Sequence, residues 1–183
     1  MNAVVVVGNP KPASRTAAVG VSVAEAVLTG SGVTSPAVQV IELSSLAPSL
    51  FSWGDPDVAA AKATVLEADL LVIASPVYKA SYTGLLKAFL DQFGRDELAA
   101  LATVPVMVGA APAHALAVET QLRPVLIEIG ASCPTRGLYV LEKVAEDSAG
   151  AIEEWLAVWG DALVAVMQAG KAIRGYDEGD ETT

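Results

Sequence analysis

Residues 70–87 read LLVIASPVYKASYTGLLK, and this stretch decides the class of fold. The run at 70–74 is apolar at every position, which is typical of a parallel strand that is buried on both faces. A proline follows almost at once, and Thr83 is a good N-cap for a helix with apolar residues at i, i+3, i+4 and i+7. The order of strand, loop and helix therefore predicts one unit of an α/β fold.

The same alternation continues along the chain. Strands are expected at 3–7, 38–43, 70–74, 104–108 and 135–141. Helices are expected at about 14–28, 58–68, 83–93, 114–129 and 149–169. Asp57 is the expected cap of the second helix, Pro124 is expected to kink the fourth, and 44–57 is expected to form a long loop. This pattern predicts a flavodoxin-like, doubly wound five-stranded parallel sheet in the order 2-1-3-4-5, with helices on both faces.

Length, charge and composition narrow the class of protein. The 183 residues are expected to form one domain at 1–174, followed by an acidic, disordered tail at 175–183. The apolar runs are expected to be too short to span a bilayer, and the first residues lack the basic segment of a secretory signal. A net charge of −10 argues against a nucleic-acid partner. We therefore expect a cytoplasmic protein without a membrane partner.

Cysteine and histidine are scarce, which limits the chemistry of the side chains. A single cysteine, Cys133, excludes an internal disulfide framework and a Cys-rich metal site, and we expect it to be inert packing. His114 is the only histidine, so His-based triads and multi-His metal sites lack partners. No GxSxG elbow is present, which argues against an α/β-hydrolase. We expect no metal site.

Ligands of such a sheet bind beyond the carboxyl ends of its strands, at the switch point between strands one and three. This rule selects the loops at 8–16, 75–83 and 109–114. The first loop, GNPKPASRT, is neither a Walker A motif nor a GxGxxG fingerprint.

The first loop ends at Ser14, Arg15 and Thr16, at the start of a predicted helix. Two hydroxyls, free backbone amides and the positive end of the helix dipole suit a terminal phosphate monoester, and Arg15 adds a charged fork. A capped helix that merely carries an arginine in its first turn explains the same residues equally well.

The second and third loops offer a surface for a flat ligand. Tyr78 carries a ring and a hydroxyl, Lys79 carries a cation, and the backbone amides of 77–79 could bond a heteroaromatic edge. Packing of Tyr78 and Tyr82 against the next helix is the alternative, but the position at the switch point favours a site. The third loop, GAAPAH, has small residues that allow a ring to approach the backbone. Its histidine is more often a structural residue than a catalyst at such a position.

Three motifs carry a resemblance to a known family. VVGNPKPASRT, SPVYKASYTGLLKAFLDQF and GAAPAHALAVETQLRPVLIEIGA resemble segments of the NADPH-dependent FMN reductases of the flavodoxin-like superfamily. The likeness is greatest to flavin reductases that serve sulfonate-degrading monooxygenases, and it covers most of 4–130. Asn9 stands where the family usually has serine, Ala110 replaces a second glycine, and Thr120 stands where some relatives place an aromatic residue.

The resemblance implies a site of three parts. It assigns the FMN phosphate to Ser14, Arg15 and Thr16, with Asn9 beside them. It assigns the isoalloxazine ring to Pro76, Val77, Tyr78, Lys79 and Ser81. It places Gly109, Ala110 and Ala111 along the border of the ring.

The resemblance also implies an activity, which is the transfer of hydride from NADPH or NADH to FMN. The cofactor carries this chemistry, so we expect no catalytic side chain beyond an electrostatic role of Lys79. Reduced FMN is expected to supply a flavin-dependent monooxygenase. Lys11, Arg95 and Arg123 are the candidate cations for the ribose phosphate of NADPH.

A homodimer or homotetramer is also implied by the resemblance. Trp53, Trp155 and Trp159 are candidates for its interface, although packing of the last two in the core is an equally good interpretation. Three other functions stay open at this point. They are a quinone or azo reductase with tightly bound FMN, a flavodoxin-type electron carrier, and an interaction protein that has kept the fold and lost the site.

Overall fold

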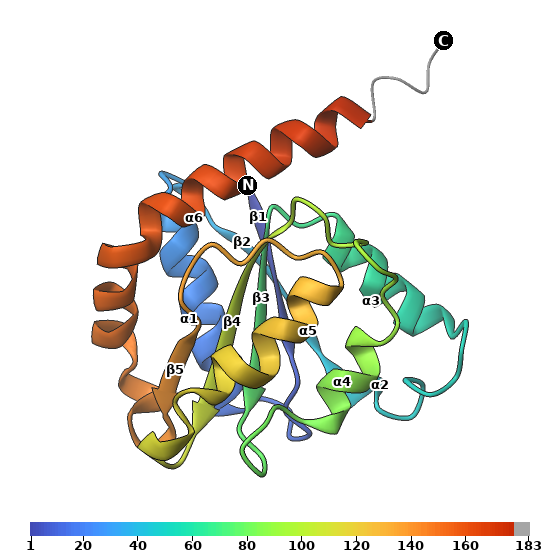
Figure 1. The fold of residues 1–183 in the computed structure, drawn as a ribbon, viewed down its shortest axis with the longest axis horizontal. Helices are drawn as coiled ribbons and strands as arrows, with labels where there is room; N and C mark the ends of the chain where they lie inside the picture. Colours follow the sequence, from blue (N-terminus) through green and yellow to red (C-terminus); the bar gives the residue numbers. More distant parts are fainter. Residues whose placement is uncertain (178–183) are drawn as a thin grey trace.

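The computed structural model describes residues 1–177 and contains a five-stranded parallel sheet (Figure 1). Its strands are β1 (Asn2–Val7), β2 (Ala37–Glu42), β3 (Leu70–Pro76), β4 (Ala102–Gly109) and β5 (Leu138–Leu141). They lie in the order β2-β1-β3-β4-β5, and every neighbouring pair is parallel. The flavodoxin-like sheet predicted from the sequence is confirmed.

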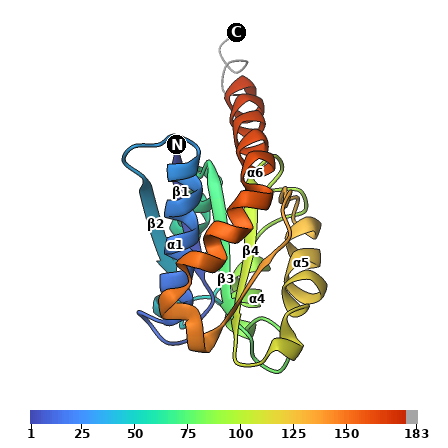
Figure 2. The ribbon, with the colours of Figure 1, turned by 90° about the vertical axis from the view of Figure 1, so that its left-hand side faces the viewer.

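Two layers of helices cover the sheet (Figure 2). Helices α1 (Arg15–Gly30) and α6 (Ala149–Asp177) lie on one face, and α3 (Pro56–Leu66), α4 (Gly84–Leu90) and α5 (Arg123–Glu128) lie on the other. Successive residues of β1 enter opposite layers: Val4 and Val6 pack in one core, whereas Val5 and Val7 pack in the other. Burial on both faces explains why this strand is an unbroken apolar run.

The segment after β2 differs from the expected loop. It begins with a short helix, α2 (Leu43–Leu46), and α3 then begins at Pro56. The cap is Asp55, whose carboxylate accepts hydrogen bonds from the amides of Asp57 and Val58. The prediction of Asp57 as cap was wrong, because a proline suits the first helical position and so leaves the cap to the residue before it.

The expected helix at 114–129 is broken into three pieces. They are a 3₁₀ turn, η1 (Pro112–His114), a π-helical turn, η2 (Val118–Leu122), and α5. Pro124 has no N–H, so it cannot donate the α-helical hydrogen bond to the carbonyl of Thr120. The helix widens to a π-helical turn just before the proline, and this change of helix type was not predicted.

Helix α6 is longer than expected, and it runs to Asp177. Within Ala149–Ile173, an 18-residue window has a mean hydropathy of 1.3, so this helix is long and apolar enough to cross a membrane by length and composition alone. One stripe of the helix nevertheless lies in the core, with Ile152, Leu163 and Met167 buried. The apolar runs at 4–7 and 70–75 lie in β1 and β3. Residues 178–183, which make up most of the predicted acidic tail, lie outside the described part of the chain.

The three tryptophans have different environments. Trp155 is buried and donates its indole N–H to the carbonyl of Arg136 at 2.8 Å, and Trp159 packs against the same core. Trp53 is 78% exposed, on the segment that leads to α3. The two tryptophans of α6 therefore stabilise the fold of the chain itself.

Helix α1 packs on the sheet so closely that Gly20 has no room for a side chain. A Cβ there would lie 2.7 Å from Val5 Cγ1 and 3.1 Å from Ala74 Cβ. We predict that Gly20→Ala lowers the free energy of unfolding by about 1–3 kcal/mol in urea denaturation, despite the better helix propensity of alanine. Gly30→Ala is the control, since a Cβ at this last residue of α1 meets no atom within 4 Å. Equal effects of the two changes would contradict close packing at Gly20.

Candidate functional site

The loops that follow β1, β3 and β4 surround one cavity of about 360 Å³. This volume lies within the usual range for small-molecule sites. The predicted site residues that line it are Asn9, Ser14, Arg15, Thr16, Pro76, Val77, Tyr78, Gly109 and Ala110. Three predicted residues do not line it, namely Lys79, Ser81 and Ala111.

A buried threonine joins the first two loops. Thr83 caps α4 by accepting from the amide of Leu86 at 3.1 Å, and it donates its hydroxyl to the carbonyl of Gly8 at 2.6 Å. The amide of Thr83 donates to Ser75 Oγ at 3.2 Å. A Cβ on Gly8 would lie only 2.7 Å from Leu86 Cβ, so glycine is required at this contact. The ends of β1 and β3 are thereby fixed against each other.

The start of α1, where the sequence predicts a phosphate, forms one end of the cavity. Ser14 caps the helix by accepting from the amide of Ala17 at 3.2 Å, and Asn9 Nδ2 donates to Thr16 Oγ1 at 3.1 Å. The amides of Arg15 and Thr16 come first in the helix, so they have no acceptor within it. Together with the helix dipole, these donors suit a phosphate group.

The guanidinium of Arg15 is held by two carboxylates. Its Nη1 lies 2.7 Å from Glu142 Oε1, and its Nε lies 3.2 Å from Glu146 Oε1. Both glutamates belong to the 3₁₀ segment η3 (Glu142–Asp147), and Glu142 itself lines the cavity. We did not predict Glu142 from the sequence, although it directly follows β5 and so lies at the same edge of the sheet.

The second loop makes a tight hairpin. Tyr78 and Ser81 exchange backbone hydrogen bonds of 2.8 and 3.1 Å, and the two residues between them have positive φ angles, 52° at Lys79 and 64° at Ala80. Two such central residues define a type I′ turn. Lys79 is exposed at its tip, which explains why it does not line the cavity.

Two of the three backbone amides of 77–79, which the sequence suggests as donors to a flat ligand, already have acceptors within the protein. The amide of Val77 donates to the carbonyl of Val108 at 2.8 Å, and the amide of Tyr78 closes the hairpin. Donors to the edge of a ring therefore have to come mainly from the third loop.

Tyr139 supports the third loop from β5. Its hydroxyl donates to the carbonyl of Ala111 at 2.6 Å, which holds Ala111 outside the lining of the cavity. A Cβ on Gly109 would lie 2.3 Å from the same hydroxyl oxygen, so the ring of Tyr139 occupies the space that a larger residue would need. Burial raises the pKa of Tyr139 more than its bond to Ala111 lowers it, so the phenol is a neutral donor at pH 7.

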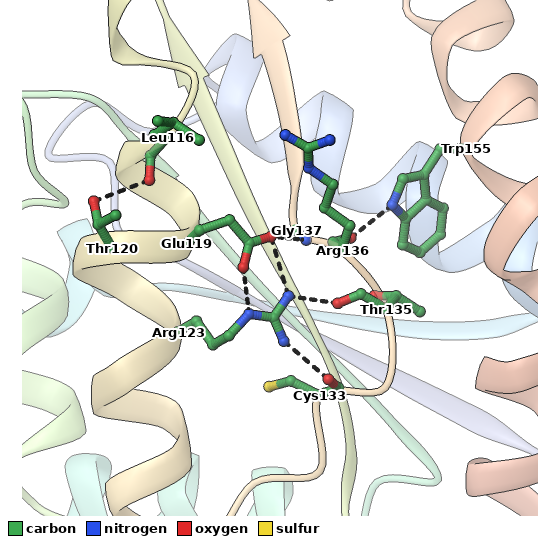
Figure 3. Close-up of polar contacts among 9 residues, drawn as sticks. All are labelled: Leu116, Glu119, Thr120, Arg123, Cys133, Thr135, Arg136, Gly137 and Trp155. Atoms are coloured by element: carbon green, nitrogen blue, oxygen red, sulfur yellow. Dashed lines mark hydrogen bonds and ion pairs between the residues drawn. The ribbon is translucent and has the colours of Figure 1, made fainter.

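A polar network ties the π-helical turn to the chain before β5 (Figure 3). Arg123 Nε lies 2.6 Å from Glu119 Oε2, and its other nitrogens donate to the carbonyls of Cys133 and Thr135. Glu119 Oε1 also accepts from the amide of Gly137 at 2.6 Å. Burial opposes ionisation of Glu119, but the bonds from Arg123 and Gly137 outweigh it and hold its pKa below the usual value.

Of the three candidate cations for a ribose phosphate, Lys11 lines the cavity. Arg123 is engaged in the network of Figure 3, and Arg95 is 82% exposed and does not line the cavity. His114 is half-buried in η1 and does not line the cavity either.

Burial raises the pKa of the Cys133 thiol to about 11, which agrees with an inert thiol at neutral pH.

A parallel sheet of this order, with a cavity at the switch point between a helix start and a loop of small residues, is typical of the flavodoxin-like class of α/β proteins. The model of the NADPH-dependent FMN reductase family matches residues 1–146, so the chain belongs to this family. The resemblance found in the sequence is confirmed.

Individual relatives agree with this assignment. An FMN reductase (NADPH) of Pseudomonas putida is 39% identical over 90 residues, which cover 49% of this chain and 43% of the relative. The NADH-dependent FMN reductase SfnF of Pseudomonas putida is 41% identical over 40% of this chain and 39% of its own length. The matches thus span less than half of these relatives. The crystal structure of an NADH:FMN oxidoreductase in its apo form is 32% identical, with a TM-score of 0.68 over 84% of this chain and 87% of the other.

We predict that Tyr139→Phe loosens the third loop. Loss of one hydrogen bond should lower the free energy of unfolding by about 1 kcal/mol and speed amide hydrogen exchange at 109–114. Tyr82→Phe is the matched control, since no hydrogen bond of its hydroxyl is found among the described residues. Unchanged exchange in Tyr139→Phe would show that the loop holds its shape without this bond.

We predict that Glu119→Gln destabilises the protein by about 2 kcal/mol at pH 7, because Arg123 and the Gly137 amide lose a charged acceptor. A carboxylate with a lowered pKa stabilises the folded state above its unfolded pKa, and this contribution is lost as the pH falls through the folded value. The difference between wild type and variant should therefore shrink below about pH 4 in urea denaturation. Exposed Glu153 provides the control Glu153→Gln, and a constant difference from pH 7 to pH 3 would contradict this account.

Proposed function

We propose that this protein is an NAD(P)H-dependent FMN reductase, which transfers hydride from a nicotinamide to FMN. One observation carries the proposal: loops that follow three strands of the sheet meet around one cavity, and the start of α1 at one end of it offers donors that suit a phosphate. Membership of the FMN reductase family supports it, and so do relatives that are named for this activity.

The residues of the cavity fit FMN in two respects. Ser14, Arg15 and Thr16 give hydroxyl, guanidinium and amide donors for the phosphate. Gly109 and Ala110 line the cavity with small residues, and the missing Cβ of Gly109 leaves room for Tyr139, which supports this loop from behind. FMN, when bound, supplies the two-electron chemistry.

The chain itself positions the flavin and stabilises charge on it. We assign no catalytic side chain. Backbone amides of 109–111 are the proposed donors to the N1/O2 edge of the ring, where charge gathers on reduction. Lys79, exposed at the tip of the hairpin, would act on this edge only as a distant cation. Lys11 is the proposed contact for the ribose phosphate, if NADPH is the hydride donor.

The fate of reduced FMN follows from the resemblance to reductases that serve monooxygenases. We propose that it leaves the site for a flavin-dependent monooxygenase, in the cytoplasm, and that the reductase is a homodimer or homotetramer. The net charge of −10 supports neither a nucleic-acid partner nor an anionic membrane surface as a partner.

Steady-state oxidation of NADPH and NADH with FMN, FAD and riboflavin tests the proposal. We expect FMN to be preferred to riboflavin, and we expect Arg15→Ala to raise the KM for FMN about tenfold with little change for riboflavin. Arg95→Ala is the control, because this arginine is exposed and does not line the cavity. No oxidation of either nucleotide with any of the flavins would overturn the proposal.

A further inference from the structure

The cation expected to hold the phosphate is shared with acidic residues. Arg15 contacts Glu142 at 2.7 Å and Glu146 at 3.2 Å, and its side chain is half exposed. Glu142 also lines the cavity beside the start of α1. The sequence EKVAED of η3 thus brings two carboxylates to the one arginine of the phosphate loop.

The charges around Arg15 do not favour the binding of a phosphate dianion. Arg15 carries one positive charge, whereas Glu142 and Glu146 carry two negative charges. On the other side of the loop, the Glu42 carboxylate accepts from the amide of Ala13 at 3.0 and 3.1 Å and from the Ser44 hydroxyl at 3.4 Å. Lys11 is the further cation that lines the cavity.

The ion pairs of Arg15 are exposed, so each contributes little to stability. An arriving phosphate can therefore displace a carboxylate from the guanidinium. The displaced Glu142 would still lie beside the cavity, where a like charge at short distance opposes binding. A phosphate bound here would therefore compete with the carboxylates for Arg15, and it would be repelled by the charge of Glu142.

We propose that Glu142 and Glu146 lower the affinity of this site for phosphorylated flavin and so make the flavin an exchangeable substrate. The inference rests on the proposed function, which it deepens. A reductase whose product is used elsewhere has to release that product, and carboxylates that compete for Arg15 speed the release. The effect is confined to the phosphate, because both glutamates act through Arg15 and the charge of the ligand.

Titration of flavin fluorescence tests the proposal on Glu142→Gln, Glu146→Gln and the double variant. We expect the double variant to bind FMN about tenfold more tightly, with slower release, and to bind riboflavin within twofold of wild type. Glu67→Gln is the charge-matched control, because Glu67 is exposed and precedes β3 at the opposite edge of the sheet. Glu142→Gln and Glu146→Gln remove only exposed ion pairs, and thermal unfolding checks that the variants are folded.

Two results would overturn the proposal while the proposed function stands. Weaker binding of FMN alone would mean that the glutamates hold Arg15 in position for the phosphate. Weaker binding of FMN and riboflavin alike would mean that Glu142 contacts the part that both flavins share. Failure of wild type and all variants to bind or reduce any flavin would instead overturn the proposed function itself.

Discussion

The hydrogen bond from Thr83 to the carbonyl of Gly8 is the contact on which the cavity depends. It is buried, and the same hydroxyl oxygen caps α4. β1 and β3 are neighbours in the sheet, and helices on opposite faces follow them. Only at this switch point do two loops leave the sheet in opposite directions and open a space between them. The bond therefore sets the distance between the end of the cavity at Ser14 and the wall at Pro76.

The strands β1, β3 and β4 were predictable because they are buried on both faces, which produces apolar runs that no surface element needs. Local features were harder to predict. The cap at Asp55 depends on the proline that follows it, and a rule for proline at the first helical position would have found it. Glu119 in the π-helical turn and Arg123 just after it bond to backbone groups between Cys133 and Gly137, which lie on another segment of the chain. Spacing along one helix carries no record of such contacts.

Predicted residues that directly follow a strand line the cavity, since parallel strands bring their carboxyl ends to one edge. Other predicted residues lie outside the cavity because tertiary contacts redirect the chain. Lys79 and Ala80 adopt positive φ angles without a glycine to signal the turn, and the hairpin carries Lys79 to its tip. Ala111 is held by Tyr139, which belongs to another strand. Glu142 also directly follows a strand and lines the cavity, but β5 lies at the edge of the sheet, away from the switch point that predicts the three loops.

The negative net charge of the chain limits how the loop at 8–16 can recognise a phosphate. A protein of net charge −10 has no broad positive field to attract a phosphate, so recognition has to be local. In the proposed site, backbone amides and hydroxyls at the start of α1 would provide that recognition without a net charge. The one arginine at this point is paired with two glutamates, so binding of a phosphate would depend more on geometry than on attraction between opposite charges. Such a site would recognise a phosphate by its shape and number of acceptors and would leave the ligand free to dissociate.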